Sequence, residues 1–208
     1  ATVYPDPVAY PSWDDSLREA FQRETELFID YQLRDDRRVT ELLSANYSFL
    51  NERLAEHYGI PQVYGSRFRR VTFRNTQRRG GVLGHGSLLA VTSYPTRTSP
   101  VLRGHFLLDR IVGSIVPPPP PDVPALPTRD ESGQPASVRD LLEAHRANPV
   151  CATCHSQMDP FGFGLENFDA IGAWRTSDGG APVDATGQLL DGTAFEGLSG
   201  LREVLLRR

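Results

Sequence analysis

The segment NPVCATCHSQMDPFGFGLENFDAIGAWR, residues 148–175, contains both cysteines of the chain, and a histidine follows the second one directly. Cys151, Cys154 and His155 form the pattern C-x-x-C-H, the attachment signature of c-type haem. Two thiols at this spacing can each add to one haem vinyl group, and the next residue then directs its imidazole at the iron. The pattern therefore predicts one covalently attached haem c with His155 as the proximal iron ligand.

Three other interpretations of this motif compete with haem attachment. A redox-active C-x-x-C pair is typical of a βαβ setting, whereas the residues before Cys151 predict a helix. A structural zinc site needs four ligands, and this chain has two cysteines. A chance pentapeptide with two free thiols is the third alternative, and the motif favours haem over all three.

The residues after the motif predict a loop beneath the haem. Asp159 and Pro160 are expected to shape this loop, and a backbone carbonyl there is expected to accept the hydrogen bond from the second ring nitrogen of His155. Trp174 is expected to pack against the haem edge.

The second axial ligand is left open by the sequence. Met158 is the only methionine and lies too close to His155 to reach the other haem face. His85 ranks first among the upstream histidines, because its flanking glycines allow close backbone approach. A tyrosine or an open, five-coordinate iron is the alternative, and an open site would favour ligand binding or peroxide chemistry. The upstream histidines are His57, His85, His105 and His145.

Composition narrows the class of protein. The chain has 208 residues and a net charge of −4, which argues against a nucleic-acid partner. All 22 basic residues are arginine, so no lysine can act as a base or a Schiff base. The 17 prolines and 18 glycines predict many turns between short helices.

Hydrophobic periodicity predicts a mainly α protein with a cytochrome-c-like helical haem domain, an additional helical N-terminal region and a small β-hairpin. Residues 65–83 alternate as a strand would, and residues 182–197 hold two turn signals that favour a hairpin. Residues 117–127 predict a polyproline strap. Helices are expected at 12–33, at two positions within 37–60 that are separated near 44–46, and at 85–93, 99–113, 137–149 and 198–208.

Localisation follows from the predicted cofactor. No run of 18 apolar residues exists, so no transmembrane helix is expected. No signal peptide is visible in the first residues. Haem c is attached on the outer side of the bacterial cytoplasmic membrane, so the protein is expected to be periplasmic or secreted, with its signal peptide removed or outside this chain.

Two long stretches carry a family resemblance: RRGGVLGHGSLLAVTSYPTRTSPVLRGHFLLDRIVGSIVPPPPPDVPAL (78–126) and HRANPVCATCHSQMDPFGFGLENFDAIGAWR (145–175). They resemble planctomycete-type cytochrome-c-like multidomain proteins, whose C-terminal domains are of unknown function. The resemblance implies an exported c-type haem protein that is often part of a longer polypeptide. It also implies three parts: a helical end of a preceding domain at 1–64, a central domain with the strap at 65–127, and the haem c domain at 128–208.

The same resemblance draws attention to two arginines. Arg97 and Arg103 would pair with the haem propionates through charge-assisted hydrogen bonds. The alternative is that they form structural ion pairs with Asp or Glu. Glu166 and Asp169 are expected to brace the loop through Arg175 rather than act as acids.

The expected function is electron transfer by an exported monohaem c-type cytochrome that serves a redox partner protein or a fused enzyme. The alternative is a haem c enzyme with an open distal face, peroxidase- or oxygenase-like, with His85 or Glu166 as its acid–base group. A carbohydrate- or surface-binding module is a third class, and no aromatic platform supports it. Whether the protein is an enzyme is left undecided by the sequence, as are the potential, the partner and the oligomeric state.

Overall fold

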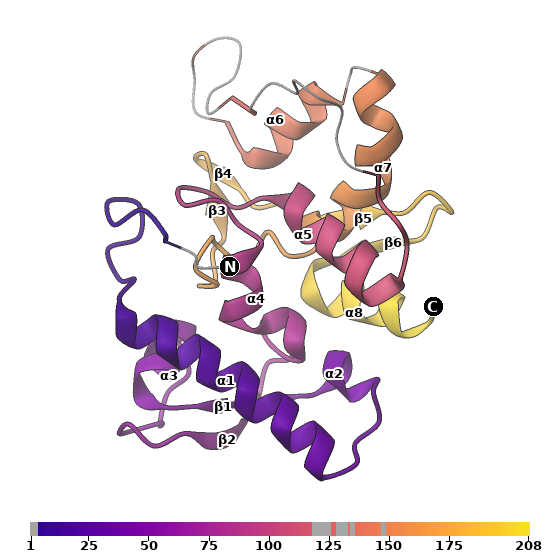
Figure 1. Ribbon diagram of the computed structural model, residues 1–208. Coiled ribbons are helices and arrows are strands. Elements are labelled where there is room, and N and C mark those ends of the chain that lie inside the picture. Colours follow the sequence, from indigo (N-terminus) through magenta and orange to yellow (C-terminus); the bar gives the residue numbers. More distant parts are fainter. Residues whose placement is uncertain (1–3, 118–125, 128–132, 134–135, 147–148) are drawn as a thin grey trace. The chain divides into compact units, whose positions relative to one another are not determined.

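The computed structural model describes residues 4–117, 126–127, 133, 136–146 and 149–208 (Figure 1). They form two compact units. The first unit contains residues up to Arg97, together with 168–174 and Arg207, and the second contains 98–167, 175–206 and Arg208. The division at 64 and 127 stays a prediction, and most of the expected polyproline strap lies outside the described residues.

The expectation of a mainly helical protein with small hairpins is confirmed, whereas a cytochrome-c-like fold stays a prediction. None of the helices in the described ranges is long and apolar enough to cross a membrane. The first unit contains α1 (Asp15–Arg34), α2 (Glu41–Ser44), β1 (Tyr47–Leu50), α3 (Glu52–Tyr58), β2 (Arg69–Thr72), the short 3-10 helix η1 (Val82–Gly84) and α4 (Gly86–Val91). The second contains α5 (Pro100–Phe106), the π-helix η2 (Leu107–Val112), α6 (Val138–His145), α7 (Pro149–Phe163), β3 (Ser177–Asp178), β4 (Ala181–Pro182), β5 (Thr186–Gln188), β6 (Ala194–Glu196) and α8 (Gly197–Leu206).

Helix α1 organises the first unit. The side chain of Asp14 accepts a hydrogen bond from the Leu17 amide and caps the helix. Leu17, Phe21 and Phe28 recur at helical spacing and are almost fully buried. The long first helix that the sequence predicts is therefore confirmed, with its apolar stripe in the core.

Residues 37–60 differ from their expected pair of helices. Helix α2 ends at Ser44, and the next residues form strand β1, which pairs antiparallel with β2 so that Tyr47 lies opposite Thr72. Aromatic residues in the segment YSFL favour a strand, and pairing with β2 supplies the backbone hydrogen bonds. Helix α3 follows, and Gly59 ends it in the left-handed conformation at φ 67°.

Helices α5 and α7 pack against each other through glycine in the second unit. A Cβ at Gly104 would overlap the backbone carbonyl of Met158, and one at Gly162 would overlap that of Pro100. The backbones of α5 and α7 are therefore so close at these two glycines that no side chain fits between them. The sequence-predicted hairpin is also confirmed in this unit, with β5 and β6 joined through a turn at Gly192.

Candidate functional site

Helix α7 carries the C-x-x-C-H motif. Pro149 occupies its first position, where the missing N–H costs no helical hydrogen bond. Cys151, Cys154 and His155 stand at i, i+3 and i+4, and residues at these spacings share one face of an α-helix. Both cysteines are free thiols of intermediate exposure. The helix therefore presents two thiols and one imidazole on the same side.

The prediction of a loop directly after the motif is wrong, because α7 continues to Phe163 and contains Pro160. Proline has no N–H, so the carbonyl of Ser156 loses its helical partner at this point. The helix nevertheless continues for another turn and is closed by a hydrogen bond from the Gly164 amide to the Pro160 carbonyl, 3.4 Å. As a result His155 and Asp159 lie one helical turn apart on a rigid element.

Asp159 orients the imidazole of His155. Its two carboxylate oxygens lie 3.0 and 3.2 Å from Nδ1 of His155, and its side chain is fully buried. A carboxylate accepts hydrogen bonds, so this contact places a proton on Nδ1, and in the neutral imidazole Nε2 then carries the lone pair. The expected backbone-carbonyl acceptor is thus replaced by a charged side chain, an arrangement common around metal-bound histidines.

The last residue of α6, His145, and the C-cap that follows it, Arg146, complete the surroundings of this pair. The ring of His145 meets that of His155 edge-on, with centroids 5.3 Å apart. Nε of Arg146 lies 3.9 Å from a carboxylate oxygen of Asp159. Helix α6 begins at its Ser137 cap, as the sequence predicts, and its C-terminal end therefore borders the His155–Asp159 pair.

These residues fit a covalently attached haem. The side chain of His155 is 16% exposed, and its Nε2 forms no hydrogen bond with any residue that the structure describes. Cys151 and Cys154 lie on the same face of α7 as His155. A structural zinc site needs four ligands. No group of three or more His, Cys, Asp and Glu side chains gathers as a metal site in the described ranges. A haem needs only one protein ligand on this face.

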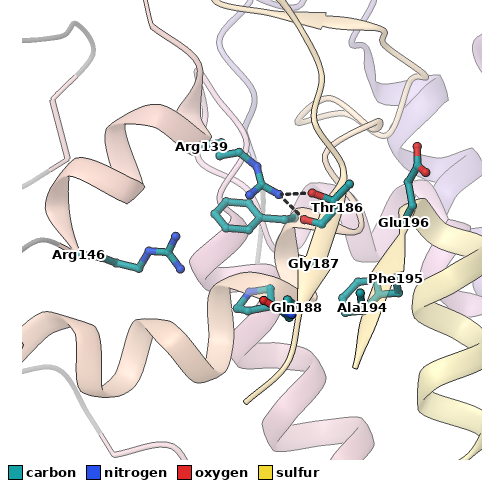
Figure 2. Close-up of a pocket in the computed structure, with 10 residues that line it drawn as sticks. Arg139, Arg146, Thr186, Gly187, Gln188, Ala194, Phe195 and Glu196 are labelled. Carbon is teal, nitrogen blue, oxygen red and sulfur yellow. Dashed lines mark hydrogen bonds between the residues drawn. The ribbon is translucent and has the colours of Figure 1, made fainter. Parts of the chain in front are cut away.

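The second unit also contains a cavity of about 710 Å³ (Figure 2). Arg139 of α6 and Arg146, the C-cap of α6, line it together with Pro160 and Phe163 of α7. Arg139 stacks on the Phe163 ring at 3.9 Å and donates to the Thr186 carbonyl. Each residue advances about 100° around a helix axis, so Pro160 and Phe163 do not share the face of the motif.

Arg103 forms a buried ion pair, which is the structural alternative that the sequence left open. Its side chain is 0% exposed and donates to Glu166 at 2.8 Å and to the Leu165 carbonyl at 2.8 Å. Contact between this buried guanidinium and a haem propionate stays a prediction. Glu166 also accepts from Arg175 at 2.7 Å and from the Thr98 hydroxyl at 2.7 Å, so its bracing role through Arg175 is confirmed.

Arg97 and Trp174 lie in the first unit. The Arg97 guanidinium stands 4.7 Å above the Tyr94 ring. Trp174 meets Phe168 edge-on at 5.4 Å, and Arg78 lies 5.3 Å from its ring. The indole Nε1 is buried and has no hydrogen-bond partner among the described residues. Haem contact by Arg97 or Trp174 stays a prediction.

His85 also lies in the first unit and is 1% exposed. Its Nδ1 lies 3.1 Å from the Thr25 hydroxyl, and its Nε2 lies 3.3 Å from the Ser48 hydroxyl. Burial lowers the pKa of His85, so the ring is neutral. A role as iron ligand would require one of these hydrogen bonds to break. The glycines beside His85 were expected to allow close approach of the backbone to the haem. In the structure, the missing side chain of Gly86 leaves space for the Phe21 ring.

Of the remaining upstream histidines, His105 is exposed on α5 and His145 lies beside His155. His57 is held within the first unit, where its Nε2–H donates to the Ile171 carbonyl at 2.7 Å. Burial lowers the pKa of His57 to about 4, although this hydrogen bond opposes the shift. The imidazole is therefore neutral at pH 7.

The depressed pKa of His57 predicts a loss of stability in mild acid. Between pH 6.5 and about 4 the unfolded chain binds a proton at this residue and the folded chain does not, so stability falls as the pH falls. The loss reaches about 3 kcal/mol, since one pKa unit corresponds to about 1.4 kcal/mol. Urea unfolding at several pH values measures it. His57→Gln should flatten this dependence, and an unchanged slope in that variant would contradict the assignment.

The sequence did not predict the role of one residue of the site, Asp159. Asp159 was expected to shape a loop, because Pro160 suggested that the helix had ended. The available signal was its spacing of four residues from His155, which places a carboxylate beside the imidazole only if the helix continues.

Two family models match this chain. Residues 79–178 match PSCyt3, a protein of unknown function (DUF1588), and residues 1–60 match PSD4, a protein of unknown function (DUF1592). No curated protein and no solved structure matches the chain. The PSCyt3 match includes α7 with its C-x-x-C-H motif. Two parts of the chain are thus similar to PSD4 and PSCyt3, which are planctomycete-type, cytochrome-like domains of unknown function.

Proposed function

We propose that this protein is an exported c-type cytochrome that holds one haem on helix α7 and carries single electrons for a redox partner protein or a fused enzyme. The observation that carries the proposal is the common helix face of Cys151, Cys154 and His155, together with the hydrogen bond that leaves Nε2 of His155 available. The haem supplies a one-electron couple, and the chain holds and orients it.

The two cysteines anchor the group covalently. Each thiol adds across one vinyl C=C bond, with the sulfur on one carbon and the hydrogen on the other, so nothing leaves and no oxidant is consumed. Because the two anchors are one helical turn apart and His155 follows at once, attachment would hold the haem beside the imidazole.

Expression in a host with a c-type haem maturation system tests the proposal. Wild-type protein should keep its colour after denaturation and extraction with acidified acetone, and its mass should increase by one haem. The double variant Cys151→Ala/Cys154→Ala should lose all covalent haem, whereas Thr153→Ala, at an exposed position inside the motif, should keep it. Complete extraction of colour from the wild type refutes covalent attachment.

A haem c enzyme with an open distal face is the second candidate. Two observations favour it: both ring nitrogens of His85 have hydroxyl partners, and a carboxylate binds the proximal imidazole. A low-spin ferrous spectrum that carbon monoxide leaves unchanged supports electron transfer. A high-spin ferrous spectrum that shifts readily with carbon monoxide supports the enzyme.

The same spectra test the second axial ligand. His85→Ala is expected to leave the spin state unchanged, because the ring already satisfies both nitrogens within the first unit. His105→Ala provides the comparison, since this side chain is exposed. Conversion from low to high spin in the His85 variant alone would instead identify His85 as the ligand.

A further inference from the structure

The carboxylate of Asp159 is the buried charge nearest to the proposed proximal ligand in the described part of the second unit. It is fully buried, and both of its oxygens lie within 3.2 Å of Nδ1 of His155. Among the described residues, Arg146 is its other charged neighbour; its Nε stands 3.9 Å away and its side chain is 25% exposed. The negative charge of Asp159 is therefore directed mainly at His155.

We propose that Asp159 is a positioning residue that makes His155 a strongly electron-donating iron ligand and thereby lowers the midpoint potential of the haem. This inference rests on the proposed function. A neutral carbonyl acceptor would fix the ring orientation equally well, so the distinctive contribution of Asp159 is its charge.

The direction of the effect follows from electrostatics. A carboxylate that accepts the Nδ1–H raises the basicity of the imidazole and thus its donation through Nε2. The oxidised iron carries one more positive charge than the reduced iron, so both the added donation and the nearby negative charge stabilise the oxidised state. In a buried, weakly screened position this interaction is stronger than at the surface.

Arg146 opposes this effect. Its guanidinium neutralises part of the Asp159 charge, although partial exposure and its second partner Glu143, 3.6 Å away, weaken that influence. The potential should therefore respond in opposite directions to the loss of Asp159 and the loss of Arg146. A purely structural hydrogen bond along the helix, from i to i+4, would leave the midpoint unchanged when Asp159 loses only its charge.

The inference also constrains the electron donor. A low-potential haem accepts electrons only from a stronger reductant than ordinary high-potential cytochromes require. The lower this midpoint is, the stronger the reductant must be that supplies electrons, one at a time, to the oxidised haem. The reduced haem then passes each electron to an acceptor of higher potential.

Potentiometric titration of the haem-loaded protein tests the inference. Asp159→Asn keeps the shape and an oxygen acceptor for Nδ1–H but removes the charge. Its ratio of reduced to oxidised haem at a fixed potential should rise at least tenfold, which corresponds to about 59 mV for a one-electron couple. Asp159→Glu retains the charge and should return the midpoint toward the wild-type value.

Two further variants complete the experiment. Arg146→Gln should lower the midpoint, and Asp140→Asn, an equal loss of charge at an exposed position of α6, should leave it unchanged. Equal midpoints for wild type and Asp159→Asn, with covalent haem in both, overturn the inference alone. If the Asp159→Asn protein does not accumulate, the Arg146→Gln variant decides. A midpoint potential of that variant equal to or above the wild-type value overturns the inference. A wild type without covalent haem overturns the proposed function, and this inference with it.

Discussion

Replacing Glu166 with Gln is expected to lower the free energy of unfolding by about 3–5 kcal/mol. The Glu166 carboxylate accepts from Arg103 at 2.8 Å and from Arg175 at 2.7 Å, and the Arg103 side chain is 0% exposed. Breaking a buried ion pair by removing one partner leaves a charge that water cannot solvate. Gln preserves the shape of the side chain, so the loss reports on charge and not on a cavity.

Urea unfolding followed by circular dichroism measures this loss. Glu26→Gln is the matched control, because Glu26 forms the same type of pair with Arg23 on the exposed side of α1. Its unfolding midpoint should stay at the wild-type value, as is usual for surface pairs. If the two Glu→Gln variants behave alike, Glu166 does not hold the second unit together in the way the contacts indicate.

The second large effect is expected for Gly162→Ala, with a loss of about 3 kcal/mol or more. A Cβ at this position would overlap the backbone carbonyl of Pro100, and backbone atoms cannot rotate away as a side chain can. Helices α5 and α7 would have to move apart, and this would loosen the packing on either side of the contact. The intrinsic helix preference of Ala over Gly, about 1 kcal/mol, is too small to compensate.

Gly200→Ala on α8 provides the comparison. Its Cβ would lie 3.1 Å from the Phe195 side chain, a contact that a small shift relieves. The gain in helix preference should therefore offset much of the cost, and the stability should change little. Thermal and urea unfolding of both variants measure the difference. A Gly162 variant as stable as the Gly200 variant would show that α5 and α7 are not in close backbone contact.

Much of the local structure could be predicted because its determinants are local. Asp14 and Ser137 cap helices α1 and α6 as their sequence positions indicate, and Gly59 ends α3. The failures came where a partner distant in sequence decided the outcome. Strand β1 was expected as helix, because its pairing with β2 is invisible in a window of a few residues.

The site shows the same division between local and distant determinants. The spacing of Cys151, Cys154 and His155 belongs to the sequence, and it suffices to predict haem attachment. The role of Asp159 depended on whether α7 would pass through Pro160. Packing of α7 against α5 favours the continued helix, and local propensity argued against it.

By itself the sequence determined the haem-attachment motif, the mainly helical character and the family resemblance, because each depends on residue types at short spacings. Tertiary structure alone decided that Arg103 is buried against Glu166, that His85 bonds to two hydroxyls, and that a carboxylate holds His155. The physical reason is that burial and hydrogen-bond partners depend on which distant segments meet. A polar side chain therefore acquires its chemistry only when the fold supplies its neighbours.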